Sequence, residues 1–217
     1  MGILSGLLDL FYPPRCAFCR KILKTGENGM CKKCDAKISR TKNGGAQGGD
    51  FLSTCVSPLY YENEVRDAIL RFKFNDATNY ADLFGGFIAS CIEENLKGRY
   101  DIISWVPLSG KRLKKRGYDQ AMLLAMSAAL KLDDVAVELL YKNTDVPAQS
   151  GVGSSEKRRA NISGVYSVAD EELVRDRRVL LIDDIVTTGS TLSECAKTLK
   201  YSGAKEVLCC TLARTRE

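Results

Sequence analysis

Residues 179–191 read VLLIDDIVTTGST, an apolar run that ends in two adjacent carboxylates and continues into small hydroxyl residues and a glycine. The run VLLI predicts a buried strand. In an open parallel sheet, ligands bind at the carboxyl ends of the strands, where the next loop and helix present unpaired backbone N–H groups. The sequence therefore places a candidate ligand site at residues 183–191.

The residues of this stretch suit a phosphorylated sugar. Asp183 and Asp184 are neighbouring negative charges, which tolerate burial poorly unless hydrogen-bond donors or a cation lie between them. Vicinal sugar hydroxyls supply such donors, and a magnesium ion held by those hydroxyls offsets the charge. The turn behind the acids offers hydroxyl donors, a glycine that permits close approach, and the dipole of the next helix. The predicted 5′-phosphate residues are Thr187, Thr188, Gly189, Ser190 and Thr191.

Strand-like and helix-like segments alternate from residue 51 onward, which predicts an α/β fold with a mostly parallel sheet. The predicted strands are CVSPLYY (55–61), DIISWVP (101–107), VAVELLY (135–141), VLLIDDI (179–185) and EVLCCTLA (206–213). The predicted helices cover 62–74, 80–96, 117–131 and 190–201, with a basic loop before the third. Neither the G-x-G-x-x-G fingerprint of dinucleotide binding nor the Walker lysine loop is present.

Four of the nine cysteines form two C-x-x-C knuckles separated by eleven residues, at Cys16, Cys19, Cys31 and Cys34. Two knuckles complete the four-sulfur shell of a structural zinc site, and the absence of histidine excludes a mixed Cys/His site. A pair of redox C-x-x-C motifs is the alternative, although neither knuckle has the strand-to-helix setting of such motifs. A closed four-cysteine shell leaves no coordination position for chemistry, so we expect it to fold a small module.

The zinc module is also basic. Residues 1–45 contain nine lysines and arginines against three acids, a net charge of +6, whereas the whole chain of 217 residues carries +5. Such a module suits nucleic acid or an acidic partner, and a solvated lysine-rich face is the alternative. The first twelve residues predict a short amphipathic helix, and no apolar run reaches the roughly 20 residues of a membrane span. We therefore expect a cytoplasmic protein without a membrane span.

The glycine-rich stretch 41–50, TKNGGAQGGD, is predicted to be a hinge. It divides the chain into two predicted domains. The first is the helix and four-cysteine module at 1–45, and the second is the α/β domain at 51–217.

The segment LLIDDIVTTGSTL resembles the phosphoribosyl-pyrophosphate (PRPP) motif of type I phosphoribosyltransferases. Together with the four-cysteine module, it resembles the ComF competence family. Three further segments fit this family: YYENEVRDAILRFKF (60–74), VPLSGKRLKKRGYDQA (106–121) and TDVPAQSGVGSSEKRRANISGVY (144–166). The resemblance covers nearly the whole chain and implies a type I phosphoribosyltransferase-like sheet with a zinc-ribbon-like module.

The resemblance also implies roles for individual residues. Asp183 and Asp184 hold the ribose hydroxyls, and residues 187–191 hold the 5′-phosphate. The leaving pyrophosphate lies near Lys73, Ser109, Lys111 and Arg112. Five of the six residues 111–116 are basic, and a solvated basic loop is the alternative for any one of them. A flexible loop that closes over the sugar carries Thr144, Gln149, Lys157, Arg158 and Asn161.

Three positions depart from the family pattern. Asp119 replaces an expected asparagine, Val152 stands where leucine is usual, and the spacing from Thr144 to Gln149 is one residue longer. The roles of the segments around these positions are therefore less closely defined by the resemblance.

These residues favour a phosphoribosyltransferase with an unnamed acceptor. Asp183, Asp184, Lys111 and Arg112 would carry catalysis by electrostatics, with magnesium bound to PRPP and no protein nucleophile. By resemblance, the protein supports DNA uptake in natural transformation and the processing of imported DNA. The alternative is a non-catalytic adaptor whose basic zinc module binds single-stranded DNA or a replication or recombination helicase. A response-regulator pocket is a weaker reading, because its acids would lie near the first strand.

Overall fold

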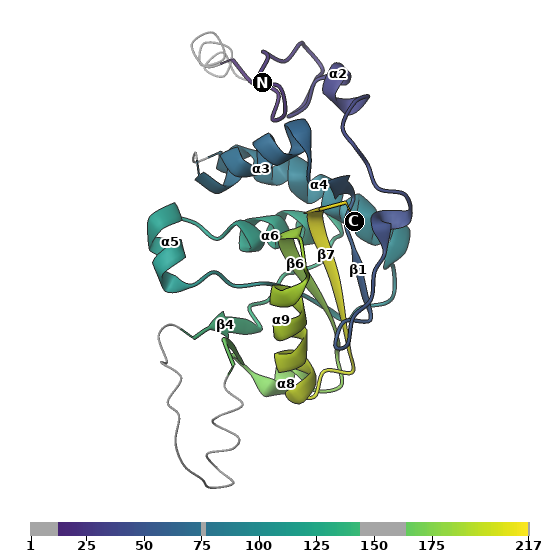
Figure 1. Ribbon diagram of the computed structural model, residues 1–217, viewed down its shortest axis with the longest axis vertical. Helices are drawn as coiled ribbons and strands as arrows, with labels where there is room; N and C mark the ends of the chain where they lie inside the picture. The colour runs from purple at the N-terminus through teal and green to yellow at the C-terminus, as the bar shows by residue number, and fades with distance from the viewer. Residues whose placement is uncertain (1–12, 75–76, 144–163, 217) are drawn as a thin grey trace, which may run out of the picture.

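The computed structural model describes residues 13–74, 77–143 and 164–216 (Figure 1). The predicted helix at residues 1–12 lies outside these ranges. The elements in chain order are α2 (Lys32–Asp35), η1 (Asn43–Gly45), β1 (Thr54–Val56), β2 (Leu59–Tyr60), α3 (Asn63–Phe74), η2 (Thr78–Tyr80), α4 (Ala81–Asn95), β3 (Ile102–Trp105), α5 (Gly110–Arg116), α6 (Gln120–Lys131), β4 (Leu140–Lys142), β5 (Tyr166–Val168), α8 (Glu171–Val174), β6 (Arg178–Val186), α9 (Ser190–Tyr201) and β7 (Glu206–Arg214).

The main sheet is parallel, in the order β1-β7-β6-β3, and β2 pairs with β7 beyond the end of β1. CVSPLYY is therefore two short strands rather than the single predicted strand. Its break falls at Ser57 and Pro58, where proline has no N–H for the ladder.

Helices cover both faces of this sheet (Figure 1). Side chains on β6 alternate between the two faces, because successive residues of a strand point in opposite directions. Leu180 and Ile182 pack with buried residues of α3, α4 and α6, whereas Val179 and Leu181 pack with buried residues of α9. This arrangement is the type I phosphoribosyltransferase-like fold, as predicted.

The prediction that 135–141 forms a strand of the main sheet is wrong. Ala136 makes one isolated parallel bridge to Ile103, and the chain then leaves the sheet edge. Only β4 is a strand, and it pairs antiparallel with β5 in a separate hairpin. Val135 is 70% exposed, so this apolar residue does not contribute to the core.

The predicted basic loop is helix α5. Ser109 caps its start by accepting a hydrogen bond from the Arg112 backbone N–H at 3.4 Å. Gly117 ends it in the left-handed conformation, with φ of 80°, which glycine adopts without steric cost. The following helix, α6, therefore begins at residue 120 rather than near 117.

The zinc module packs against the sheet domain. Phe18, which is 3% exposed, makes edge-to-face contacts with Phe84 and Phe87 of α4 at ring-centroid distances of 6.2 and 6.4 Å. Figure 1 shows the module above α3 and α4, at the end of the molecule where β7 finishes. The apolar core therefore continues from the sheet domain into the cysteine module.

The glycine-rich stretch is packed rather than a free hinge. Gln47 pairs with Cys55 of β1, and the Ser57 N–H donates to the Gly44 carbonyl at 2.7 Å. Gly44 is buried at φ of 65°, and a Cβ there would lie 3.0 Å from the Val56 Cβ. The division of the chain into domains 1–45 and 51–217 stays a prediction.

Candidate functional site

Asp183 and Asp184 lie near the carboxyl end of β6 and, as consecutive strand residues, face different sides. The carboxylate of Asp184 forms an ion pair with Lys73, with Nζ and Oδ2 2.8 Å apart. Asp183 accepts a hydrogen bond from the Asp184 backbone N–H at 2.8 Å. Burial and then the neighbouring charge of Asp184 raise the pKa of Asp183 well above its usual range. A hydrogen-bond donor or a cation supplied by a ligand would therefore stabilise the Asp183 carboxylate.

The turn after β6 forms a small cradle. Gly189 has φ of 73°, and the Ser190 backbone N–H and hydroxyl both lie near the Thr188 hydroxyl, at 3.4 and 3.1 Å. Residues 183 and 185–192 line a space of about 30 Å³. The twelve-residue α9 begins here, so its first N–H groups and its dipole favour an anion at this turn.

A second wall comes from the glycine-rich stretch, which the sequence had indicated only as a hinge. Residues 47–50 and the turn 186–190 face each other across a cavity of about 470 Å³. Leu52, Cys55, Leu192 and Ser193 complete the lining. The stretch 41–50 is therefore part of the surroundings of the candidate phosphate turn.

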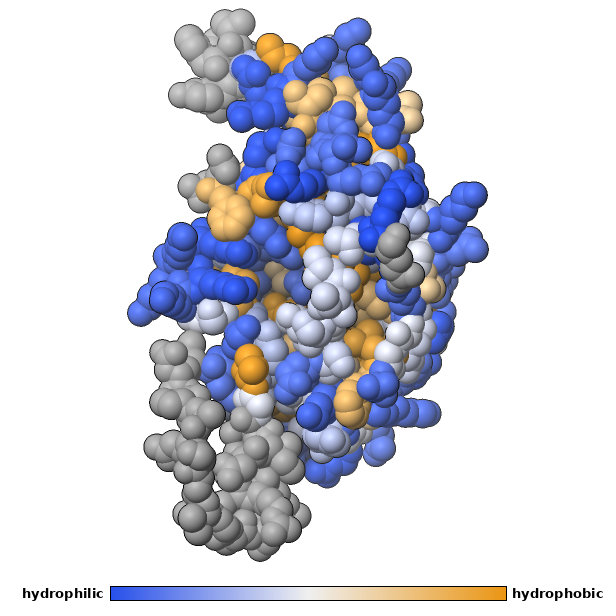
Figure 2. All heavy atoms as spheres, viewed as in Figure 1, coloured by the Kyte–Doolittle hydropathy of each residue, from blue (hydrophilic) through white to orange (hydrophobic). Residues whose placement is uncertain are grey.

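The segment after β3 places the predicted pyrophosphate residues on α5. Ser109 uses its hydroxyl as the helix cap, and Lys111 and Arg112 are exposed. Figure 2 shows hydrophilic residues over this part of the surface. The segment after β3 thus forms a cationic helix, and the pyrophosphate role of these residues stays a prediction.

Asp119, which stands where the family pattern has asparagine, organises this segment. Its carboxylate accepts hydrogen bonds from the backbone N–H groups of Leu108 at 2.9 Å and Met122 at 3.1 Å. It therefore caps α6 and fixes the loop before α5 together. Burial raises the pKa of Asp119, partly opposed by these N–H donors, and the charge of Asp184 raises it further.

Lys142 and Tyr166 are two residues near the site that the sequence reasoning missed. Lys142 Nζ lies 3.1 Å from the Tyr166 hydroxyl, across the β4–β5 hairpin. Burial and then the charge of Arg112 lower the pKa of Lys142, whereas Asp183 raises it. Asp183 therefore lies within electrostatic range of a cation on the hairpin. Tyr166 is the last residue of the family-like segment 144–166 but was given no role, and Lys142 lies outside that segment. Only the antiparallel pairing of β4 and β5 shows that the two side chains meet.

The predicted flexible-loop residues Thr144, Gln149, Lys157, Arg158 and Asn161 lie outside the described residues. The β4–β5 hairpin marks where that loop leaves and rejoins the domain.

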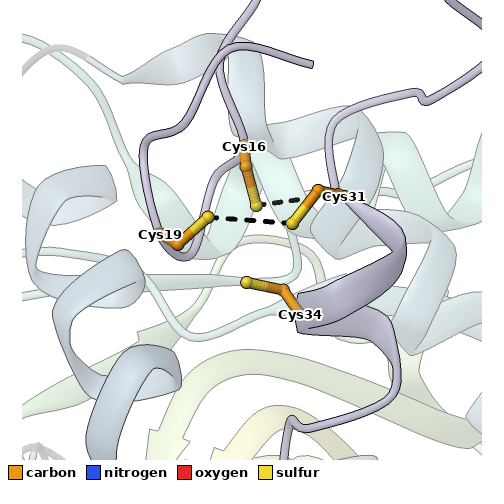
Figure 3. Close-up of side chains that lie close together, drawn as sticks. All are labelled: Cys16, Cys19, Cys31 and Cys34. Atoms are coloured by element: carbon orange, nitrogen blue, oxygen red, sulfur yellow. Dashed lines mark hydrogen bonds between the residues drawn. The ribbon is translucent and has the colours of Figure 1, made fainter. Parts of the chain in front are cut away.

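The four predicted zinc ligands converge. The sulfur atoms of Cys16, Cys19, Cys31 and Cys34 all lie within 4.8 Å of one another (Figure 3). The Sγ atoms of Cys19 and Cys31 are 3.7 Å apart, close to the roughly 3.8 Å edge of a tetrahedron with zinc–sulfur bonds of about 2.3 Å.

The charge state of these thiols also suits a metal. Burial opposes ionisation of Cys16, but backbone N–H donors, led by that of Cys31, outweigh it and lower its pKa to about 7. Burial and the neighbouring thiols raise the pKa of Cys34, so a cation is needed before all four ionise. The arrangement fits a structural zinc site rather than two separate redox pairs.

Comparisons with known proteins agree with both parts of the chain. The phosphoribosyl transferase domain model matches residues 113–217, and the double zinc ribbon domain model matches residues 7–45. Competence protein F of Haemophilus influenzae is 31% identical over 227 residues, covering 94% of this chain and 98% of that protein. The chain belongs to the ComF family. Membership of this family argues against the response-regulator hypothesis and supports a role in competence or DNA uptake.

Other relatives of this ComF protein have names that concern DNA. The DNA utilization protein YhgH of Salmonella typhi is 25% identical over 230 residues, covering 95% of this chain and 99% of that protein. Among solved structures, the glutamine phosphoribosylpyrophosphate amidotransferase of B. subtilis has a TM-score of 0.46 and 17% identity, covering 64% of this chain and 30% of that one.

Within the described residues, no helix has the length and apolar character that crossing a bilayer requires.

Proposed function

We propose that this ComF protein binds PRPP, or a related ribose 5-phosphate, and transfers the phosphoribosyl group to an acceptor while it supports the processing of imported DNA. One observation carries the proposal. The paired acids Asp183 and Asp184 lie near the carboxyl end of the buried parallel strand β6, two residues before the turn that forms the small cradle, and Lys73 Nζ lies 2.8 Å from Asp184 Oδ2.

The charges around the site suit such a ligand. Ribose hydroxyls would donate to Asp183 and Asp184, which satisfies carboxylates that are otherwise costly to bury. Lys73 then becomes available to the pyrophosphate, alongside Lys111 and Arg112 on α5. Magnesium bound with PRPP would offset the remaining negative charge.

Catalysis would be electrostatic. The bond from the anomeric carbon to pyrophosphate breaks while the acceptor's nucleophilic atom bonds to that carbon, so positive charge builds on the sugar ring and negative charge departs with pyrophosphate. Lys73 and the α5 cations stabilise the leaving group, and Asp183 and Asp184 hold the ring in position. No protein nucleophile is required, which agrees with a chain that contains no histidine.

Calorimetry with PRPP and magnesium tests the binding half of the proposal. We expect the Asp183→Asn and Asp184→Asn variants to bind at least tenfold more weakly, since each loses a charged acceptor worth about 1.5–3 kcal/mol. The matched control is Glu171→Gln on α8, an exposed acid before the start of β6. Equal affinity in all four proteins would exclude these acids from the site.

Turnover requires a separate measurement. Purified protein incubated with PRPP, magnesium and cell extract should release pyrophosphate faster than extract alone, and the Asp184→Asn variant should not. If binding persists without added release in any extract fraction, the protein is a binding protein rather than a transferase.

The adaptor function has its own supporting observation. Lys21, Lys24, Lys32 and Lys33 are all exposed on the zinc module, whose surface in Figure 2 is largely hydrophilic. Phosphate contacts give salt-dependent affinity for nucleic acid. In fluorescence anisotropy with a single-stranded oligonucleotide, the Lys32→Glu/Lys33→Glu variant should bind more weakly, with a smaller salt slope. The Lys97→Glu/Lys205→Glu variant is the control, and equal losses in both variants would count against docking on the module.

A further inference from the structure

Arg71 ties the end of α3 to the zinc module. Its Nη2 atom donates hydrogen bonds to the backbone carbonyls of Ala17 at 2.7 Å and Phe18 at 2.8 Å. These are the two residues between the zinc ligands Cys16 and Cys19. The Arg71 Nε atom is buried and has no partner among the described residues. The guanidinium is therefore committed to the carbonyls of the first knuckle, and their positions depend on the cysteines on either side.

The same helical turn reaches the candidate ribose site from its other side. Residues two apart on an α-helix point about 200° apart, so Arg71 and Lys73 project to opposite sides of α3. Lys73 forms its 2.8 Å ion pair with Asp184. Figure 1 shows α3 lying between the module and the carboxyl end of the sheet. One turn of helix thus contacts the zinc knuckle and the paired acids.

The residue between these two side chains holds the turn in place. Phe72 is fully buried and packs edge-to-face on Phe84 at 5.5 Å, and its ring centroid lies 6.1 Å from that of Tyr118. The Tyr118 hydroxyl donates a hydrogen bond to the Phe72 carbonyl. Phe84 also packs on Phe18 of the knuckle. A displacement of the knuckle is therefore transmitted through packed rings as well as through Arg71.

We propose that zinc in the four-cysteine site sets the position of Lys73, with Arg71 as the positioning residue, so that zinc binding and sugar-phosphate binding are coupled. The ligand half of this inference rests on the proposed function. The coupling is reciprocal, because each ligand must change the affinity for the other by the same factor. The knuckle is then a control point for the sugar site as well as a folding element.

A double-mutant cycle on PRPP affinity tests the route. Arg71→Met should weaken PRPP binding about tenfold, within the range typical of coupled sites. In a Lys73→Met background, the same change should alter the affinity less than about twofold, because the side chain it positions is absent. Arg66→Met, an exposed arginine of the same helix, is the control and should bind like the wild type. Arg71→Lys should recover part of the loss. Additive losses in the cycle would overturn the proposal.

Hydrogen exchange of α3 tests, without any sugar ligand, whether zinc binding holds this helix in position. Chelation of zinc and the Arg71→Met change should each speed exchange in residues 69–74 at least tenfold, whereas Arg66→Met should leave it unchanged. Unchanged exchange in zinc-free protein would overturn the inference. If wild-type protein fails to bind PRPP, the proposed function fails, and this exchange measurement alone decides whether the knuckle positions α3.

Discussion

Replacing Lys73 by methionine should destabilise the protein measurably, because Lys73 is the cation paired directly with Asp184. The two side chains are only 17% and 12% exposed. Charge centres about 4 Å apart attract by roughly 4 kcal/mol at an effective dielectric constant near 20. Removing one partner of a buried pair costs about 3–5 kcal/mol, and the residual exposure reduces this to about 2 kcal/mol. For a domain of this size, that lowers Tm by roughly 4–8 °C.

The assay is thermal and urea unfolding of Lys73→Met, Asp184→Asn and the double variant. Asp184→Asn removes a carboxylate that repels Asp183, so its cost should be smaller than that of Lys73→Met. The double variant should recover at least half of the stability lost in Lys73→Met, since no unpaired charge remains at position 184. Lys97→Met, an exposed lysine, is the control. An unchanged Tm in Lys73→Met, or additive losses in the double variant, would refute this account of the site.

Three other substitutions follow from the same geometry. Asp119→Ala removes two hydrogen bonds from backbone N–H groups and should lower the free energy of unfolding, measured in urea, by about 2 kcal/mol. Asp119→Asn should retain most of the wild-type stability, and equal losses in the two variants would contradict the capping role. Asp183 has a folded-state pKa above its unfolded value of about 4, so its carboxyl adds stability as the pH falls from neutral toward 4. Asp183→Asn should therefore raise stability at pH 7 by about 1 kcal/mol and remove that pH dependence, and an unstable variant would contradict this. Gly85→Ala should cost about 1–3 kcal/mol, because its Cβ would clash with the side chain of Ser127 on α6. Gly86→Ala should not, since the nearest atom to its Cβ would be Lys131 Cε at 3.6 Å, an ordinary contact. Equal Tm values would show that α4 and α6 can separate.

The strands of the sheet were predictable where the sequence has a continuous apolar run. β6 and β7 read as apolar runs, and α9 begins immediately after a glycine turn, so the end of β6 could be placed from sequence. The four-cysteine site was predictable as well, since its ligand spacing is itself the chemical requirement.

Tertiary packing determines the conformation of the segments that local sequence pattern predicted wrongly or did not mark. The glycine-rich stretch has the composition of a linker, yet Gly44 fits against Val56 because it has no side chain. The apolar segment at 135–141 reads as a strand, but β3 offers it a single bridge. Lys142 lies outside every family-like segment, and it meets Tyr166 only through the hairpin. Pairing partners of this kind are set by the whole fold rather than by local pattern.

The register of β1 constrains the order in which the chain assembles during synthesis. β1 pairs with β7, and the buried hydrogen bond between Ser57 and Thr211 joins positions 154 residues apart. A ribosome therefore exposes the β1 edge for most of the time that it takes to make the protein, at about 5–20 residues per second. Until β7 emerges, the unpaired β1 edge is open to other strands, so the newly made chain is vulnerable to misassembly for about 8–30 s.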